Sequence, residues 1–318
     1  MSKHIPSITQ PCPICGETGK FSYTGKDLLM GLPGDFNYAT CNTCETVYQT
    51  PTPDPETISS FYPDGYDPYQ PGQAKERNAL QKAVLHTIYG YKHLSSRLPD
   101  WIGQLAGTIA YRNSIPYKTD GHLLDVGCGG GKFLLSMQRL GWRVEGVEFN
   151  SSATQTCREL GLEVFQGELS AANFPDNHFD VVTARHVIEH IATPKPFITE
   201  IFRILKPGGV MVLITPNSKA LGRNWFGTNW YANEVPRHLF LFASNNLQLL
   251  TTQIGFQKIA IRTSSSPKIF LNSWDYLTHN KGTPSKRRKI RRFFARGYVL
   301  AAALCRSGDE IFSIFQKP

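Results

Sequence analysis

Two features that would place a protein in a membrane or outside the cell are missing from this 318-residue sequence. It has no run of 18 apolar residues, so a membrane-spanning helix is not expected. Its first residues, MSKHIPSITQPCPICG, lack the apolar stretch of a secretory signal peptide. We therefore expect a cytoplasmic protein, and a hydrophobic fraction of 41% provides for a sizeable core.

Acidic residues are missing from the segment KRRKIRRFFAR at 286–296. This segment holds seven basic residues and accounts for most of the formal net charge of +9. Charge gathered in one segment is weak evidence for a nucleic-acid partner. The apolar run 298–305 follows, and the whole stretch is expected to be helical. Such a helix can pack on the protein or also touch anionic lipid, and we favour packing.

Cysteine is scarce, but four of the seven cysteines form two C-x2-C pairs separated by 25 residues. In a reducing compartment, paired C-x2-C motifs favour a metal over disulfides. Zinc prefers four thiolates in tetrahedral geometry, and no further ligand is evident near the pairs. The sequence therefore predicts a structural zinc site at Cys12, Cys15, Cys41 and Cys44.

Strand-like and helical segments alternate from residue 122 onward. The runs HLLDVG, RVEGVEF, EVFQG, FDVVTA and VMVLITPN have the composition of strands. Helices are expected at about 151–160, 196–205 (stopped by LKPGG) and 244–254. This alternation predicts an α/β fold with a parallel sheet.

A glycine-rich loop, LLDVGCGGGKF, follows the first of these strands. Glycine is required where backbone approaches a ligand or adopts positive φ. A dinucleotide site would need GxGxxG, but Lys132 stands three residues after Gly129. The pattern is instead GxGxG after an acid, Asp125, and a second acid, Glu148, ends the next strand.

This arrangement resembles motif I of class I S-adenosylmethionine-dependent methyltransferases. The resemblance runs from about residue 120 to 262 and includes GELSAANFPDNHFDVV, FDVVTARHVIEHI and LKPGGVMVLITPN, which are similar to the third, fourth and fifth motifs of that family. It implies a Rossmann-like sheet of seven strands with the last one antiparallel. The C-terminal SGDEIFSIFQKP would be that strand, which makes about 264–307 an insertion.

The resemblance also implies a cofactor site for S-adenosylmethionine. Asp125 would organise the glycine turn and the amino-acid end of the cofactor, and Glu148 would accept hydrogen bonds from the ribose hydroxyls. Glu168 and Leu169 would flank the adenine. The full set of candidates is Asp125, Gly127, Cys128, Gly129, Gly131, Glu148, Phe149, Glu168, Leu169 and Arg185.

Histidines are the candidates for removing a proton from a methyl acceptor. His186 follows the fourth expected strand, at the sheet edge where open α/β folds bind ligands, and it ranks first. His190 belongs to the Ile-Glu-His triplet, and packing in the core explains it at least as well as a catalytic role does. His238 lies in EVPRHLFLF, a region where this family builds acceptor sites, and His178 is more remote. The aromatic residues of 224–242 either line an acceptor pocket or cover the sheet.

The cysteine segment resembles the N-terminal zinc module of bacterial methyltransferases that act on sugars. We expect a zinc module at 1–55, a connector and helical segment at 56–115, and a methyltransferase domain at 116–318. The leading function is methyl transfer to a small molecule or glycan, at a sugar hydroxyl or carbon. One alternative is an RNA methyltransferase, disfavoured because the basic residues lie far from the cysteines. The other is a non-catalytic cofactor-binding scaffold.

Overall fold

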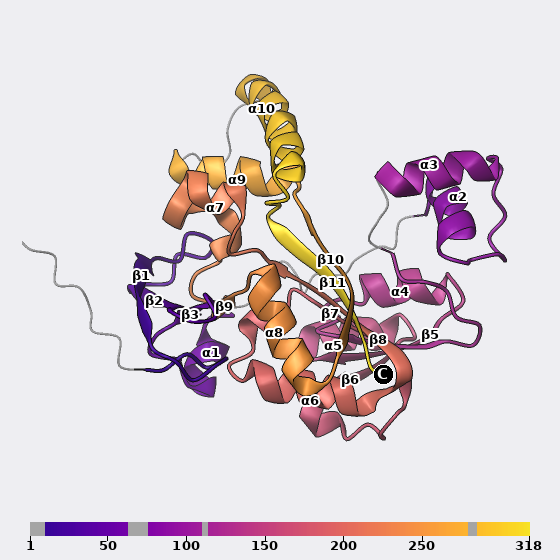
Figure 1. Ribbon diagram of the computed structural model, residues 1–318, viewed down its shortest axis with the longest axis horizontal. Helices are drawn as coiled ribbons and strands as arrows, with labels where there is room; N and C mark the ends of the chain where they lie inside the picture. Colours follow the sequence, from indigo (N-terminus) through magenta and orange to yellow (C-terminus); the bar gives the residue numbers. More distant parts are fainter. Residues whose placement is uncertain (1–9, 63–75, 110–113, 279–284) are drawn as a thin grey trace, which may run out of the picture. The chain divides into compact units, whose positions relative to one another are not determined.

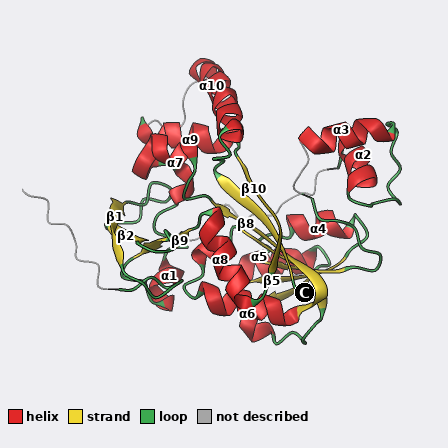
Figure 2. Ribbon diagram, viewed as in Figure 1, coloured by secondary structure: helices red, strands yellow, loops and turns green. Residues whose placement is uncertain are grey.

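Two β-sheets organise the described part of the chain, which comprises residues 10–62, 76–109, 114–278 and 285–318 of the computed structural model (Figures 1 and 2). The larger sheet has seven strands in the order β10-β11-β8-β7-β4-β5-β6. In that order the strands are β10 Gln257–Ser264, β11 Glu310–Gln316, β8 Leu205–Pro216, β7 Phe179–Arg185, β4 His122–Val126, β5 Arg143–Glu148 and β6 Glu163–Gln166.

Buried apolar runs explain the parallel part of this sheet. Strands β4, β5 and β6 pair in parallel, and all five residues of His122–Val126 are buried. A strand buried on both faces is typical of parallel sheets covered by helices. The last strand was expected to be antiparallel, and this is confirmed, because β11 pairs antiparallel with both β10 and β8.

The helices begin and end largely where the sequence signals place them. The Asn150 side chain caps α5 by accepting a hydrogen bond from the Ala153 N–H, and Gly255, with φ of 117°, ends α8. The helices are α1 Pro55–Ser60, α2 Ala79–Ile88, α3 Asp100–Ile109, α4 Lys132–Gln138, α5 Ser151–Glu159, α6 Pro194–Ile204, α7 Leu221–Phe226, α8 Ser244–Ile254, α9 Pro267–Leu277 and α10 Ser285–Leu304, with 3-10 turns at Leu169–Ala172, Ile188–His190, Gly227–Asn229 and Tyr231–Asn233.

One boundary differs from the expectation. The LKPGG sequence was expected to be the end of a helix that precedes a strand beginning at Val210. Helix α6 does end at Ile204, but β8 begins at once with Leu205 and includes LKPGG. Positive φ at Gly208 lets the chain pass through this point as part of the strand.

The smaller sheet joins distant parts of the sequence. It has the order β1-β2-β3-β9, where the first three strands come from the cysteine segment. They are β1 Gly19–Gly25, β2 Phe36–Cys41, β3 Val47–Gln49 and β9 Phe240–Leu241.

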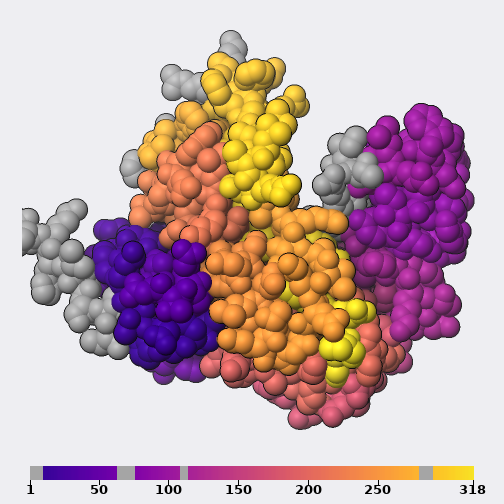
Figure 3. All heavy atoms as spheres, viewed as in Figure 1, coloured from indigo at the N-terminus to yellow at the C-terminus, as the bar shows by residue number. Residues whose placement is uncertain are grey.

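The chain divides into two compact units. The first unit comprises residues 1–64, 184–203 and 210–318, and the second comprises 65–183 and 204–209. In the first unit the cysteine segment lies against α8 (indigo and orange in Figure 3), and the Asn246 side chain donates a hydrogen bond to the Cys44 carbonyl at 3.2 Å. The expected connector falls partly on residues 63–75 and 110–113, outside the described residues.

The predicted insertion forms α9 and α10, which are part of the first unit (Figure 1). Ala295, Tyr298 and Ala302, spaced three and four residues apart, bury one face of α10 in an apolar cluster with Phe226 and Phe270. Asp309 holds this packing through its Oδ1, which accepts hydrogen bonds from Tyr298 Oη at 2.6 Å and Trp230 Nε1 at 2.9 Å. Within the described residues, no helix has both the length and the apolar character needed to cross a membrane.

Candidate functional site

The glycine loop connects β4 to α4 within the second unit. Gly127, Gly129 and Gly131 have φ of 68°, 52° and 74°, a region that side chains with a Cβ rarely adopt. A Cβ on Gly131 would also lie 2.6 Å from Leu162 Cδ1. The loop therefore requires glycine at three positions, as the sequence pattern indicated.

Two buried carboxylates border this loop. Glu148 is 6% exposed, and its Oε2 and Oε1 accept hydrogen bonds from the Gly129 and Asn150 N–H groups, each at 2.8 Å. Burial raises the pKa of Glu148 despite these bonds. Asp125 is 3% exposed and accepts a hydrogen bond from the Thr183 hydroxyl. Glu148 thus fixes the loop directly, whereas Asp125 joins the strand before the loop to β7 through Thr183.

The remaining cofactor candidates differ in exposure. The Phe149 ring directly follows Glu148 and is 62% exposed, so its face is available to stack on a ligand ring. Glu168 and Arg185 are exposed, whereas Leu169 and Cys128 are buried. All except Arg185 belong to the second unit. Thr183 and Cys157, whose thiol donates to the Gly129 carbonyl, also support the loop but were not among the candidates.

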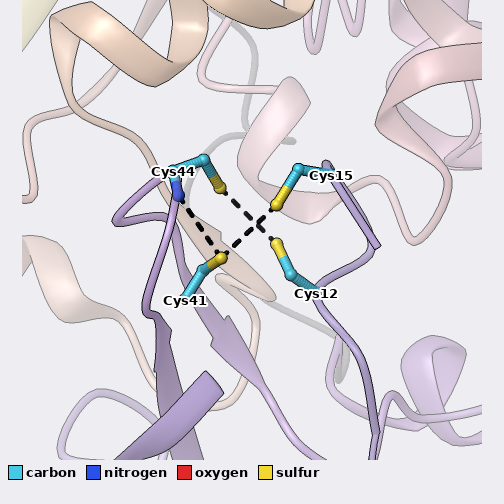
Figure 4. A group of neighbouring side chains, drawn as sticks. All are labelled: Cys12, Cys15, Cys41 and Cys44. Carbon is cyan, nitrogen blue, oxygen red and sulfur yellow. Dashed lines mark hydrogen bonds between the residues drawn. The ribbon is translucent and has the colours of Figure 1, made fainter. Parts of the chain in front are cut away.

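The four paired cysteines converge on one point of the first unit (Figure 4). Cys12 Sγ lies 3.6 Å from Cys44 Sγ, and Cys15 Sγ lies 3.4 Å from Cys41 Sγ. These distances exceed a disulfide bond of about 2.05 Å. They approach the sulfur separation of about 3.8 Å that tetrahedral Zn–S bonds of about 2.3 Å require. The Thr43 and Cys44 N–H groups, each 3.4 Å from Cys41 Sγ, would stabilise its thiolate, so these residues fit a zinc ion.

The histidine candidates of the first unit surround one carboxylate, that of Glu189. Its side chain is fully buried, and neither oxygen has a hydrogen-bond partner. His186 Nδ1 lies 3.4 Å and His238 Nε2 lies 3.9 Å from Glu189 Oε1, and the His190 ring stacks edge-on against that of His238. Sequence reasoning included the three histidines but missed Glu189, although the Ile-Glu-His triplet contained it.

His186 lies between two acids just after β7. Burial opposes its protonation, but Glu189 and Glu310, each 3.4 Å from a ring nitrogen, raise the pKa of His186 to about 10. The imidazole therefore carries a proton at neutral pH, although its 44% exposure weakens the ion pairs through solvent screening. In that state it cannot accept a proton, which disfavours the expected role as a base. Its φ of 56° is another sign of a constrained position.

Backbone carbonyls orient the rings of His190 and His238. His190 Nδ1 lies 3.0 Å from the Arg237 carbonyl and 2.8 Å from Tyr62 Oη, and His238 Nδ1 lies 2.9 Å from the Ala232 carbonyl. A carbonyl only accepts, so each Nδ1 carries a hydrogen. Burial and the nearby His238 lower the pKa of His190 to about 4.

The more remote candidate, His178, occupies a different place. It precedes β7 at the amino end of that strand, and its ring lies 4.9 Å, centroid to centroid, from that of His122. Most of the aromatic residues of 224–242 are buried in the core, among them Trp230 at 1% exposure. Packing against the sheet and in the core thus explains most of these aromatic residues, whereas the Trp225 side chain is 57% exposed.

An apolar hollow of about 640 Å³ opens beside α10 in the first unit. Phe293 and Phe294 are 75% and 53% exposed at its rim, and Lys289, Arg292 and Arg296 are exposed on the same helix. The side chains of residues 286–288 lie outside the described ones. Its lining includes Trp225, Phe226, Phe270, Trp274, Phe293 and Phe294.

Comparison with known proteins places the central part of the chain in a family. The family described as "Methyltransferase domain" matches residues 92–261. A ubiquinone biosynthesis O-methyltransferase of Maricaulis maris is 36% identical over 124 residues, covering 36% of this chain and 49% of that protein. The mitochondrial ubiquinone biosynthesis O-methyltransferase of Schizosaccharomyces pombe is 34% identical over 110 residues, covering 32% and 40%. The chain therefore spans about half the length or less of these curated relatives.

A solved structure supports the fold. A chain from the complex between the Haloferax volcanii Trm112 methyltransferase activator and a methyltransferase aligns with a TM-score of 0.50 and 15% identity. The alignment covers 77% of this chain and 100% of that chain. The expected seven-stranded Rossmann-like sheet is thus confirmed, together with its antiparallel strand.

Proposed function

Because the chain belongs to the methyltransferase domain family, we propose that it transfers a methyl group from S-adenosylmethionine to a hydroxyl of a small-molecule acceptor. The observation that carries this proposal is the glycine loop with its two carboxylates, Asp125 and Glu148. The names of the relatives, ubiquinone biosynthesis O-methyltransferases, support a small acceptor and an oxygen as the methylated atom. A sugar hydroxyl, the acceptor implied by the resemblance of the cysteine segment, fits the same chemistry.

The cofactor would be held by residues of the second unit. Glu148 would exchange its bonds to backbone N–H groups for bonds from the ribose hydroxyls, and the exposed Phe149 ring would cover the adenine. Glycine at positions 127 and 129 leaves room for the amino-acid end. When bound, S-adenosylmethionine supplies the methyl group on its sulfonium, and the protein contributes mainly the positioning of the acceptor.

The polar cluster of the first unit would receive the acceptor. We define it as His186, Glu189, His190 and His238. The Nε2 atoms of His190 and His238 would bind the acceptor hydroxyl, and a protonated His186 would bind a developing or resident negative charge.

We further propose that the exposed face of α10, beside the hollow, binds to an anionic lipid surface. On such a surface, the exposed phenylalanines would insert among the apolar lipid chains, and the exposed lysine and arginine side chains beside them would bind the anionic headgroups. The same helix can pack on the protein and contact lipid, because one face of α10 is buried in the apolar cluster and another face is exposed. An acceptor with an apolar tail would then be met at the lipid surface.

Methyl transfer with labelled S-adenosylmethionine tests the function. Purified protein is offered hydroxylated phenols with isoprenoid tails, nucleotide sugars, lipid-linked glycans and RNA. The proposal predicts label in a small molecule as a methyl ether, and Glu148→Ala should reduce the rate at limiting cofactor. Label found in RNA alone would replace the proposal by the RNA alternative. Tight cofactor binding without transfer to any acceptor class would favour the scaffold alternative.

A further inference from the structure

Glu189 is a buried carboxyl group whose two oxygens have no hydrogen-bond partner. Its carboxylate has no exposed surface and no hydrogen-bond donor, and the groups facing it are the rings of His186 and His238 at 3.4 and 3.9 Å. A buried carboxylate without donors costs several kcal/mol unless a cation compensates it. His186 reaches only Oε1 and is shared with Glu310, so Oε2 remains uncompensated.

Two imidazole rings adjoin this carboxylate. His190 Nδ1 lies 3.0 Å from the Arg237 carbonyl and His238 Nδ1 lies 2.9 Å from the Ala232 carbonyl, so each ring can donate from Nδ1 and offer Nε2 to another partner. Metal-bound histidines usually have this arrangement, in which one nitrogen donates to a carbonyl and the other binds the ion. One ligand atom from each of Glu189, His190 and His238 lies within 4.8 Å of the others. Metal bonds of about 2.0–2.2 Å place tetrahedral ligand atoms about 3.4 Å apart, so these side chains would move closer together on binding.

The segments that carry Glu189, His190 and His238 favour an ion that is held tightly over one that exchanges at the surface. The three ligands come from the Ile188–His190 turn and from the segment before β9. These segments are joined by the hydrogen bond from the Leu239 N–H to the Glu189 carbonyl at 2.7 Å. The Glu234 carboxylate lies 3.8 Å from His238 Nε2 and is paired with Arg237 Nε at 3.2 Å. The cluster is therefore preorganised and largely buried.

We propose that Glu189, His190 and His238 bind a divalent transition-metal cation, a second metal site distinct from the four cysteines. Two imidazoles and one carboxylate are the ligand set of catalytic zinc and non-heme iron sites, in which a further position stays open. Oxygen-preferring Mg²⁺ fits this set less well. A cation here would bind an acceptor hydroxyl and lower its pKa. Metal binding itself does not depend on the proposed methyl transfer.

Cobalt substitution tests the site without an activity measurement. Untagged protein is produced in cobalt-supplemented medium, and its cobalt content is measured together with its absorption spectrum. The wild type should hold two cobalt ions per chain, one with the intense sulfur-to-cobalt band of a cysteine site and one with only weak bands. Glu189→Gln and His238→Ala should each remove the second ion. His93→Ala, a change at an exposed histidine outside the cluster, should retain both.

The sulfur-to-cobalt band reports in every variant whether the cysteine segment, which pairs with β9 in the same unit, is folded. If Glu189→Gln and His238→Ala each lose one cobalt ion while the sulfur-to-cobalt band is unchanged, the assignment is supported. A wild type with a single cobalt ion bound by sulfur would overturn it, as would two ions in Glu189→Gln. If His238→Ala loses both ions through misfolding, Glu189→Gln, which keeps the side-chain volume, decides the question.

Discussion

Asp27 and Arg237, which are 210 residues apart, form a bidentate ion pair whose two side chains are both fully buried. Arg237 Nη2 lies 2.8 Å from Asp27 Oδ1, and Nη1 lies 3.1 Å from Oδ2. Burial disfavours the charged carboxyl, but the bonds from Arg237 lower the pKa of Asp27 overall. Because His238 directly follows Arg237, this pair fixes the cysteine segment to the residue that presents an imidazole to Glu189.

Replacing Asp27 by Asn should destabilise the first unit by about 3–5 kcal/mol, because the buried guanidinium loses its bidentate partner and keeps only the single ion pair with Glu234 at 3.2 Å. Urea unfolding measures this loss. Asp35→Asn is the matched control, since Asp35 forms an exposed ion pair with Lys26 at 3.6 Å. The control should cost less than about 1 kcal/mol. Equal stability of the two variants would show that the buried pair does not hold the segment in place.

Removal of one cysteine ligand should release zinc. In Cys41→Ser protein, elemental analysis should find one zinc fewer per chain than in the wild type, and residues 10–50 should become sensitive to protease, since small metal modules depend on the ion for folding. Cys305→Ser changes an exposed, isolated thiol and should keep the zinc. Full zinc content in Cys41→Ser would refute the four-cysteine site.

The polar cluster should matter for turnover more than for cofactor binding. His186→Ala is expected to lower turnover at least about tenfold, within the range of acid–base and charge effects, with nearly unchanged cofactor affinity. His238→Ala is compared in the same assay. If His186→Ala is active and His238→Ala is not, His238 is the residue that acts on the acceptor. Full activity of both would mean that positioning alone suffices.

Lipid contact should depend on the exposed phenylalanines of α10. Wild-type protein should sediment with anionic liposomes at low salt and less at high salt, because screening weakens the attraction of the basic residues. The double change Phe293→Ser and Phe294→Ser should reduce sedimentation. Leu249→Ser, an exposed apolar residue on α8, should not reduce it. No binding at low salt would leave α10 with a packing role alone.

Local signals predicted the framework well. The glycines at 127, 129 and 131, the buried strand before them and the C-x2-C pairs each require a particular backbone or ligand, so their pattern is visible in a single sequence. Strand β9 was not foreseen, because two residues that pair with a distant segment have no periodicity. The same holds for Asp27 with Arg237 and for the unpartnered state of Glu189, which depend on packing between segments far apart in the chain.

The central claim is that the glycine loop and Glu148 bind S-adenosylmethionine, and isothermal titration calorimetry tests it most directly. The wild type should bind S-adenosylmethionine or its demethylated product with a micromolar dissociation constant, and NAD much more weakly. Glu148→Ala should weaken binding by about 1–3 kcal/mol through the loss of charge-assisted hydrogen bonds. Glu163→Ala, a change at an exposed acid on β6, should leave it unchanged. Preferential binding of NAD, or undiminished affinity in Glu148→Ala, would contradict the account.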